Sequence, residues 1–211
     1  FKWIFAVSLL VMAATYPFKD KLPEPQEYLG LQLNEPSQTP TLRSPFSITA
    51  NNQHYIIKPR FNYELSGVVV TFNDAAGFTN IWHHRRWKDF INVRDICVIW
   101  GDNVRTGVYK NIHFSSDSWT CWFFWQDQNT GHLFQSTALS NNHLLTNSRA
   151  IKSQMLQAEK GDVVYFKGVL ADYSNQATGA SRRTSISRDD DGNGACETVY
   201  VDEFKILKKA N

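Results

Sequence analysis

The pattern of apolar and polar residues changes after residue 53, where short runs rich in β-branched and aromatic side chains begin. Runs of this kind, bounded by Gly, Asn and Asp, are typical of strands. The pattern predicts strands at 54–58, 61–73, 95–100, 118–125, 163–173 and 197–207. Most of this part of the chain is therefore expected to be β-structure.

One stretch of the same region has apolar residues at helical spacing. Residues 139–145 begin it and residues 148–158 continue it, with Ser148 suited to be an N-cap. His143 falls near the start of this predicted helix, where polar groups cap free backbone donors. The spacing of the histidines indicates no site.

With the short candidate at 54–58 set aside, the predicted elements in chain order are three strands, a helix and two strands, which is the order of an OB-fold. The passage 161–170 (GDVVYFKGVL) resembles the fourth strand of many OB-folds, in which a Gly-Asp turn feeds an alternating strand and a glycine permits sharp coiling. We therefore predict a mainly β domain at 54–211, an OB-like five-stranded barrel with a helix between strands 3 and 4. A β-sandwich with a helical insertion is the rival architecture.

The N-terminal segment has a different pattern, because residues 3–18 are mostly apolar and carry no charge. At about 1.5 Å per residue they span roughly 24 Å, against about 30 Å for the hydrocarbon core of a bilayer. Either a cleaved signal peptide, with Ala13 and Ala14 at the cleavage site, or a retained anchor fits. We favour a transmembrane signal anchor at 1–18. It predicts a single-pass protein of a bacterial inner membrane, with its C-terminal domain in the periplasm.

Residues 19–53 contain five prolines and many Gln, Asn, Ser and Thr, with no apolar period. Proline removes a backbone donor and biases the preceding residue toward extended geometry. This predicts a Pro-rich linker over 19–53. Either it is a semi-extended spacer that holds the domain off the membrane or lies along a partner, or it is a disordered tether.

Composition narrows the function classes. The 211 residues include 22 basic and 20 acidic side chains, a net charge of +2, which makes a nucleic-acid partner unlikely. The mean hydropathy of −0.39 excludes a multi-span membrane protein. Three cysteines, Cys97, Cys121 and Cys196, allow one disulfide, and the sequence leaves all three pairings open.

The segment 179–197 is the least generic part of the chain. It resembles a segment shared by uncharacterised bacterial proteins with one N-terminal span, a resemblance that implies location and no activity. In OB-folds the corresponding loop flanks the binding face. The side chains Asp189, Asp191 and Asn193, followed by a glycine, match the opening of a calcium loop, with Glu197 at the ninth position. The twelfth position lacks the bidentate glutamate, so a plain acidic turn is the alternative to a calcium site.

Two further sets of side chains suggest a surface for a ligand or partner. Arg182, Arg183 and Arg188 either form a site for a phosphate or carboxylate or pair with the acids of their own loop. In the run at 118–125, aromatic residues occupy positions that point to both faces of one strand. Since only one face can be buried in the barrel, the rings on the other face must be exposed. The exposed face predicted from these sets comprises Trp119, Trp122, Phe124, Arg182, Arg183 and Arg188.

The sequence contains no recognisable nucleophile–base motif and no phosphate-binding loop, so we do not expect an enzyme. The main hypothesis is a membrane-anchored extracytoplasmic accessory or scaffold subunit that binds a protein partner in a membrane complex. One alternative is an OB module for an oligosaccharide or single-stranded nucleic acid. The other is a calcium- or metal-dependent hydrolase built on the 189–197 loop.

Overall fold

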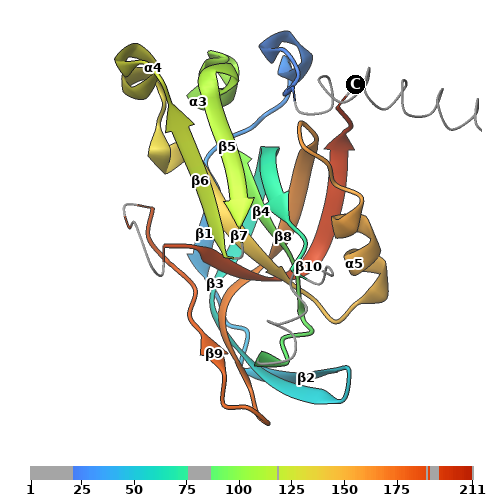
Figure 1. Ribbon diagram of the computed structural model, residues 1–211. Helices are drawn as coiled ribbons and strands as arrows, with labels where there is room; N and C mark the ends of the chain where they lie inside the picture. The colour runs from blue at the N-terminus through green and yellow to red at the C-terminus, as the bar shows by residue number, and fades with distance from the viewer. Residues whose placement is uncertain (1–20, 76–86, 118, 189, 191–194, 211) are drawn as a thin grey trace, which may run out of the picture.

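The computed structural model describes residues 21–75, 87–117, 119–188, 190 and 195–210 (Figure 1). The predicted anchor at 1–18 lies outside these residues. The strands are β1 (Ser37–Pro40), β2 (Phe46–Ala50), β3 (Gln53–Asn73), β4 (Asn92–Ile99), β5 (Ile112–Asp117), β6 (Thr120–Trp125), β7 (Leu139–Leu145), β8 (Val163–Asn175), β9 (Ser181–Arg182) and β10 (Glu197–Lys208). They form a large mixed sheet and a separate two-stranded sheet, which confirms the prediction of a mainly β chain.

The helices in the described residues are short. They are η1 (Pro25–Tyr28), α3 (Asp102–Arg105), η3 (Val108–Asn111), α4 (Gln128–Leu133), η4 (Ser136–Ala138) and α5 (Arg149–Leu156). Ser148 caps α5 as predicted, because its side chain accepts a hydrogen bond from the backbone N–H of Ile151. Within the described ranges, no helix has the length and apolar character needed to cross a bilayer.

Five long strands are hydrogen-bonded in a circuit. β3 pairs with β4, β4 with β7, β7 with β10, β10 with β8, and β8 again with β3. All of these pairings are antiparallel except that of β7 with β10, which is parallel. The order around the circuit is first, second, third, fifth and fourth in the chain, with α5 between the third and fourth strands. The main sheet has eight strands and not five, because β1, β2 and β9 pair at its edges.

Two predicted elements differ from the observed ones. Residues 139–145 form strand β7 and not the start of a helix, because β4 and β10 pair with its two edges and hold it extended. The two strands predicted at 54–58 and 61–73 are one strand, β3, with an irregularity between Pro59 and Phe61.

The predicted linker 19–53 is also corrected, because its described part, 21–53, packs on the domain. β1 and β2 both pair with β3. Leu22, Tyr28 and Leu33 are buried in the main hydrophobic core. A few isolated apolar residues hold this segment on the domain, because each is buried in the hydrophobic core formed by the rest of the chain.

Every strand of the circuit contributes side chains to the main core. They include Leu65 from β3, Ile96 from β4, Leu144 from β7, Phe166 from β8 and Phe204 from β10. A smaller core on the other face of the sheet gathers Tyr55, Ile57, Leu145, Val169 and Tyr200 with their neighbours.

The close approach of β8 and β10 explains the glycine predicted to coil the strand. A Cβ added at Gly168 would run into the backbone carbonyl of Tyr200 on β10. Only glycine lets the two backbones come this close.

The hairpin formed by β5 and β6 stands beside the main sheet, with α3 and α4 at the same end of the molecule (Figure 1). A disulfide between Cys97 on β4 and Cys121 on β6 joins it to the sheet. Of the three pairings that the sequence left open, the structure has this one, and Cys196 keeps a free thiol.

Candidate functional site

A group of polar side chains lies on the outer face of the sheet, where β4, β7 and the start of β10 run side by side. Asp95 on β4 is the register partner of His143 on β7, and His143 is also the partner of Thr198 on β10. Register partners point to the same side of a sheet, and so do residues two apart in one strand. Asn141 therefore shares the face of His143, and Cys196 shares that of Thr198.

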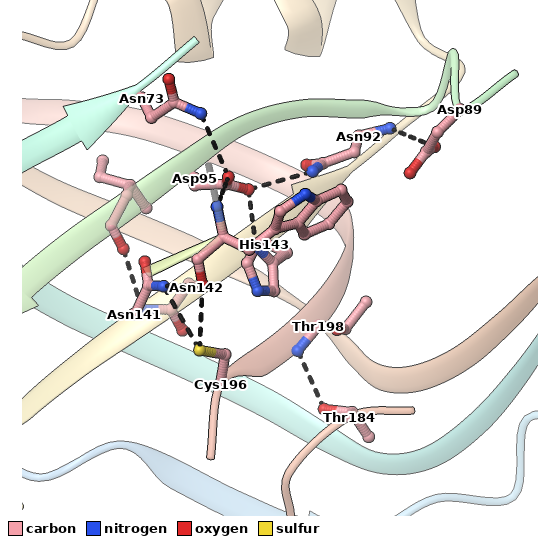
Figure 2. Close-up of polar contacts among 12 residues, drawn as sticks. Asn73, Asp89, Asn92, Asp95, Asn141, Asn142, His143, Thr184, Cys196 and Thr198 are labelled. Atoms are coloured by element: carbon pink, nitrogen blue, oxygen red, sulfur yellow. Dashed lines mark hydrogen bonds and ion pairs between the residues drawn. The ribbon is translucent and has the colours of Figure 1, made fainter. Parts of the chain in front are cut away.

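Asp95 and His143 form a buried pair at the centre of this face (Figure 2). The His143 Nδ1 atom lies 2.6 Å from Asp95 Oδ1. The carboxylate also accepts hydrogen bonds from the side-chain amides of Asn92, at 3.0 Å, and Asn73, at 3.4 Å. Each donor stabilises the ionised carboxylate, so the pair is held in a fixed orientation.

The electrostatics of the pair favour its charged form. Burial alone would lower the pKa of His143, but the charge of Asp95 and the hydrogen bond to its carboxylate outweigh it and raise the pKa to about 9. Burial would likewise raise the pKa of Asp95, yet the charge and hydrogen bond of His143 hold it below its ordinary value. At neutral pH this face therefore carries an imidazolium beside a carboxylate.

The free thiol of Cys196 is the third member of the group. Its side chain is partly exposed, whereas His143 is buried. The Asn141 side-chain amide donates to Cys196 Sγ at 3.4 Å, and the thiol is 3.6 Å from the backbone carbonyl of Trp119 (Figure 2). Cys196 therefore lies on the same face as the Asp95–His143 pair and is held there by Asn141 and Trp119.

Trp119 and Arg182, both predicted as surface residues of one face, do meet here. Trp119 precedes β6, its φ is +75°, and its ring lies 5.0 Å from the imidazole of His143. The guanidinium of Arg182 lies over the ring of the same indole. Burial lowers the pKa of Arg182, while the charge of Cys196 is among those that raise it. The φ of Trp119 is one that non-glycine residues rarely adopt, and such strain clusters at functional sites.

The space beside Arg182 is small. A cavity of about 10 Å³ is lined by residues that include Tyr55, Trp87, Tyr173 and Arg182. That is about the volume one water molecule needs. A sugar ring or a base does not fit there without movement of these side chains.

The other predicted arginines do not join this group. Arg183 is exposed. Arg188 enters the opposite face of the sheet, where it pairs with Glu197 and donates to the hydroxyl of Tyr63 at 2.8 Å. The acid that pairs with Arg188 is therefore Glu197, and the three arginines do not form one anion site.

Of the residues predicted for a calcium loop, only Glu197 lies among the described residues. Asp189, Asp191 and Asn193 lie outside the described residues. Glu197 is buried, and its carboxylate is bound by Arg188 and by the Ser140 hydroxyl at 2.6 Å. Both of its oxygens are thus engaged by other side chains. Among the residues the structure describes, no cluster of three His, Cys, Asp or Glu side chains is placed to hold a metal.

Trp122 and Phe124 form a second surface, which we call the aromatic platform. Both point away from the core, with 50% and 55% of their surface exposed, and their rings stack at 6.5 Å. The alternate side chains Cys121 and Phe123 pack inward against the main core. Trp122 and Phe124 are exposed as predicted, and so is Trp125 of the alternate set at the end of the strand; Cys121 and Phe123 join the hairpin to the sheet instead of filling a barrel.

The sequence interpretation missed Asp95 and His143 as site residues. It placed His143 at a helix start and treated Asp95 as the first residue of a buried strand. The sequence holds only a weak signal for them: residues 140–143 (SNNH) are all polar, so no alternation singles out His143, and Asp95 is the one charged residue of the apolar run 95–100.

No family model, curated protein or solved structure matches this chain.

Proposed function

We propose that this chain is an OB-like binding module that docks a protein partner outside the cytoplasm through the aromatic platform. The OB-like assignment is supported by the order of strands around the circuit, with the parallel pairing of the third and fifth strands. The position of α5 between the third and fourth strands also supports it. A core shared by all five strands is what such a barrel would enclose.

The observation that carries the proposal is the exposure of the aromatic platform. Trp122 and Phe124 leave two large rings half exposed and stacked on one face of a hairpin. Aromatic residues are enriched at the buried centres of protein interfaces, where Trp and Tyr dominate the binding energy. An apolar partner surface laid on these rings would remove them from water.

The platform is also rigid, which reduces the entropy cost of binding. The disulfide of Cys97 and Cys121 fixes β6 to the sheet. At the beginning of β6, the Trp119 backbone carbonyl accepts from Asn141 at 3.1 Å, and its N–H donates to Asp95 at 3.3 Å. A surface already held in its binding geometry loses little conformational freedom on association.

The charge around the platform favours a protein over a nucleic acid. The range 112–125, which covers both strands of the hairpin, contains no lysine or arginine. Proteins that stack bases combine aromatic rings with a positively charged groove along the backbone. The platform lacks the second component.

The disulfide supports a location outside the cytoplasm, because such bonds persist mainly in oxidising compartments. Together with the anchor predicted at 1–18, it fits an accessory or scaffold subunit of a membrane complex. The partner would then be another extracytoplasmic protein with an apolar patch.

Site-specific photo-crosslinking in native membranes tests this function. A photoreactive amino acid replaces Phe124 in the full chain, and in a matched control it replaces Leu207, which is 49% exposed on β10. We expect position 124 to capture one defined protein and position 207 not to. With that protein purified, Trp122→Ala should weaken binding by about 30-fold, equal to about 2 kcal/mol.

Equal capture at both positions would contradict the proposal, as would unchanged affinity of the Trp122→Ala chain. Quenching of tryptophan fluorescence by an oligosaccharide or single-stranded DNA, lost in Trp122→Ala, would instead favour the ligand-binding alternative. Capture of a second copy of this chain would make the platform a self-association surface.

A further inference from the structure

The aromatic platform lies on a strand with an open edge. β5 and β6 form a sheet of two strands, and every residue of β6 has a register partner on β5. The inner face of this hairpin packs on the main sheet, where the Ser116 hydroxyl lies 3.0 Å from that of Thr71 on β3. β6 is the outer strand of the hairpin (Figure 1).

The backbone of β6 has hydrogen-bonding capacity on the side away from β5. In an antiparallel pair, the N–H and C=O groups of every second residue bond to the neighbouring strand, and those of the other residues point away from it. Among the described residues, no strand pairs with this second edge, and no backbone hydrogen bond of a loop or cap reaches 120–125. About half of the backbone groups of β6 are therefore open to a binding partner.

β6 lacks the features that usually protect an open edge. Proteins place charged side chains, proline or a bulge there, or keep the strand very short. β6 has six residues (TCWFFW) without a charge or a proline, and its register with β5 has no irregularity. At the edges of the main sheet, by contrast, β1 ends in Pro40, β9 has two residues, and the exposed side chains of β2 are Ser47 and Thr49. The edge of β6 is thus suited to pairing with another strand.

The size of the exposed surface favours a narrow partner segment. Trp122, Phe124 and Trp125 are 50%, 55% and 45% exposed. An aromatic side chain has roughly 150–250 Å² of surface, so the three rings together expose roughly 300 Å². A stable interface between two folded proteins, including two copies of this chain, takes about 800 Å² per partner. An extended segment of about six residues is roughly 20 Å long and matches the length of β6.

We propose that the docked partner adds an extended segment as a third strand at the open edge of β6, an inference that rests on the proposed function. The backbone groups of β6 bind the segment, and side chains at every second position of the segment lie beside Trp122 and Phe124. Those positions are apolar, because β6 offers aromatic rings and no charge to pair with. A third strand also stabilises a sheet that has only two.

Position-resolved photo-crosslinking in native membranes tests the added strand. A phenylalanine analogue that bears a diazirine replaces Thr120, Trp122 or Phe124 of the full chain, one at a time. Mass spectrometry then identifies the partner residue that each position captures. These side chains share one face of β6 and span about 13 Å, at about 3.3 Å per residue.

An added strand should give captured residues within one segment, two positions apart at each step. The steps run in opposite directions for an antiparallel and a parallel strand, and either direction agrees with the proposal. A helix rises about 1.5 Å per residue, so a helical partner would cover the same 13 Å with about nine residues instead of about four.

His113 is the matched control position. It is exposed and is the register partner of Phe124, so it lies on the same face but one strand further from the open edge. Neighbouring strands are about 4.8 Å apart, which places a third strand beside β6 about 10 Å from β5. The analogue at position 113 should therefore capture at most about a fifth of the amount captured at position 124. Equal capture would mean that the partner lies across the face of the hairpin, which contradicts the proposal.

Hydrogen exchange of the wild-type chain gives a second measurement that needs no substitution. In the complex with the captured protein, the amides of 120–125 that point to the open edge should exchange at least about tenfold more slowly, because each donates to the added strand. Unchanged exchange over these residues would refute the added strand.

The outcomes separate this inference from the docking function. Absence of capture at positions 120, 122 and 124 would refute both. Capture at 124 with partner residues in unrelated segments, or with helical steps, would refute the added strand and leave docking in place. Regular two-residue steps that map to a second copy of this chain would contradict the assignment of the strand to a partner protein.

Discussion

The buried Asp95–His143 pair should make the stability of this protein fall as the pH rises above neutrality. The perturbation is a change from pH 6 to pH 9.5. The folded-state pKa of His143 is raised to about 9, whereas an unperturbed histidine has about 6.5. A group whose pKa is raised by folding contributes stability below its unfolded pKa and loses that contribution as the pH passes the folded pKa.

The size of the effect follows from the difference of about 2.5 pKa units. At about 1.4 kcal/mol per unit, the free energy of unfolding should drop by about 3 kcal/mol between pH 6 and pH 9.5. Asp95 shares the same interaction, so its contribution is not added again.

Urea unfolding at pH 6, 7.5 and 9.5, without reductant, measures the effect. The wild-type chain should show the decline and His143→Gln should show a nearly flat profile at lower stability. His113→Gln, an exposed histidine, should behave as wild type. The reasoning would be refuted if the free energy of unfolding of the wild-type chain changed by less than about 0.5 kcal/mol over this range. An equal decline in His143→Gln would also refute it.

Three further substitutions test the fold. Arg188→Met leaves the buried Glu197 carboxylate without its cation, and urea unfolding should show that the free energy of unfolding falls by about 3–5 kcal/mol. The double variant Arg188→Met with Glu197→Gln should recover part of this loss. Gly168→Ala places a methyl group against the β10 backbone and should cost roughly 3 kcal/mol, and a normal melting temperature would contradict the close packing. Replacing Cys97 by serine and Cys121 by alanine removes a disulfide between residues 24 positions apart and should cost about 3 kcal/mol in the same assay. No loss of stability would show that packing alone holds the hairpin.

The strands with unbroken apolar runs were predictable because their signal is local. Strand β8 has Val163, Val164 and Phe166 in a pattern that only an extended, buried segment explains. Strand β7 was not predictable in this way. Its polar residues are buried because distant groups satisfy them, Ser140 by Glu197 and His143 by Asp95. A local pattern contains no information on such partners, so the segment was interpreted as an amphipathic helix.

The candidate site was only partly predictable for the same reason. Trp119 and Arg182 stand out by residue type, and both were predicted to face a ligand or partner. Their contact with each other and with His143 depends on the register of strands far apart in the sequence. The Asp95–His143 pair brings together residues 48 positions apart, a spacing that no short motif contains.

The place of β10 in the circuit has a consequence for how the chain folds. β10 follows every other strand in the sequence, yet it lies between β7 and β8 and is hydrogen-bonded to both. Until residues 197–208 are available, β7 and β8 each present an unpaired edge, and such edges promote aggregation. Folding must therefore wait until synthesis has passed this strand, and contacts this distant in sequence form slowly.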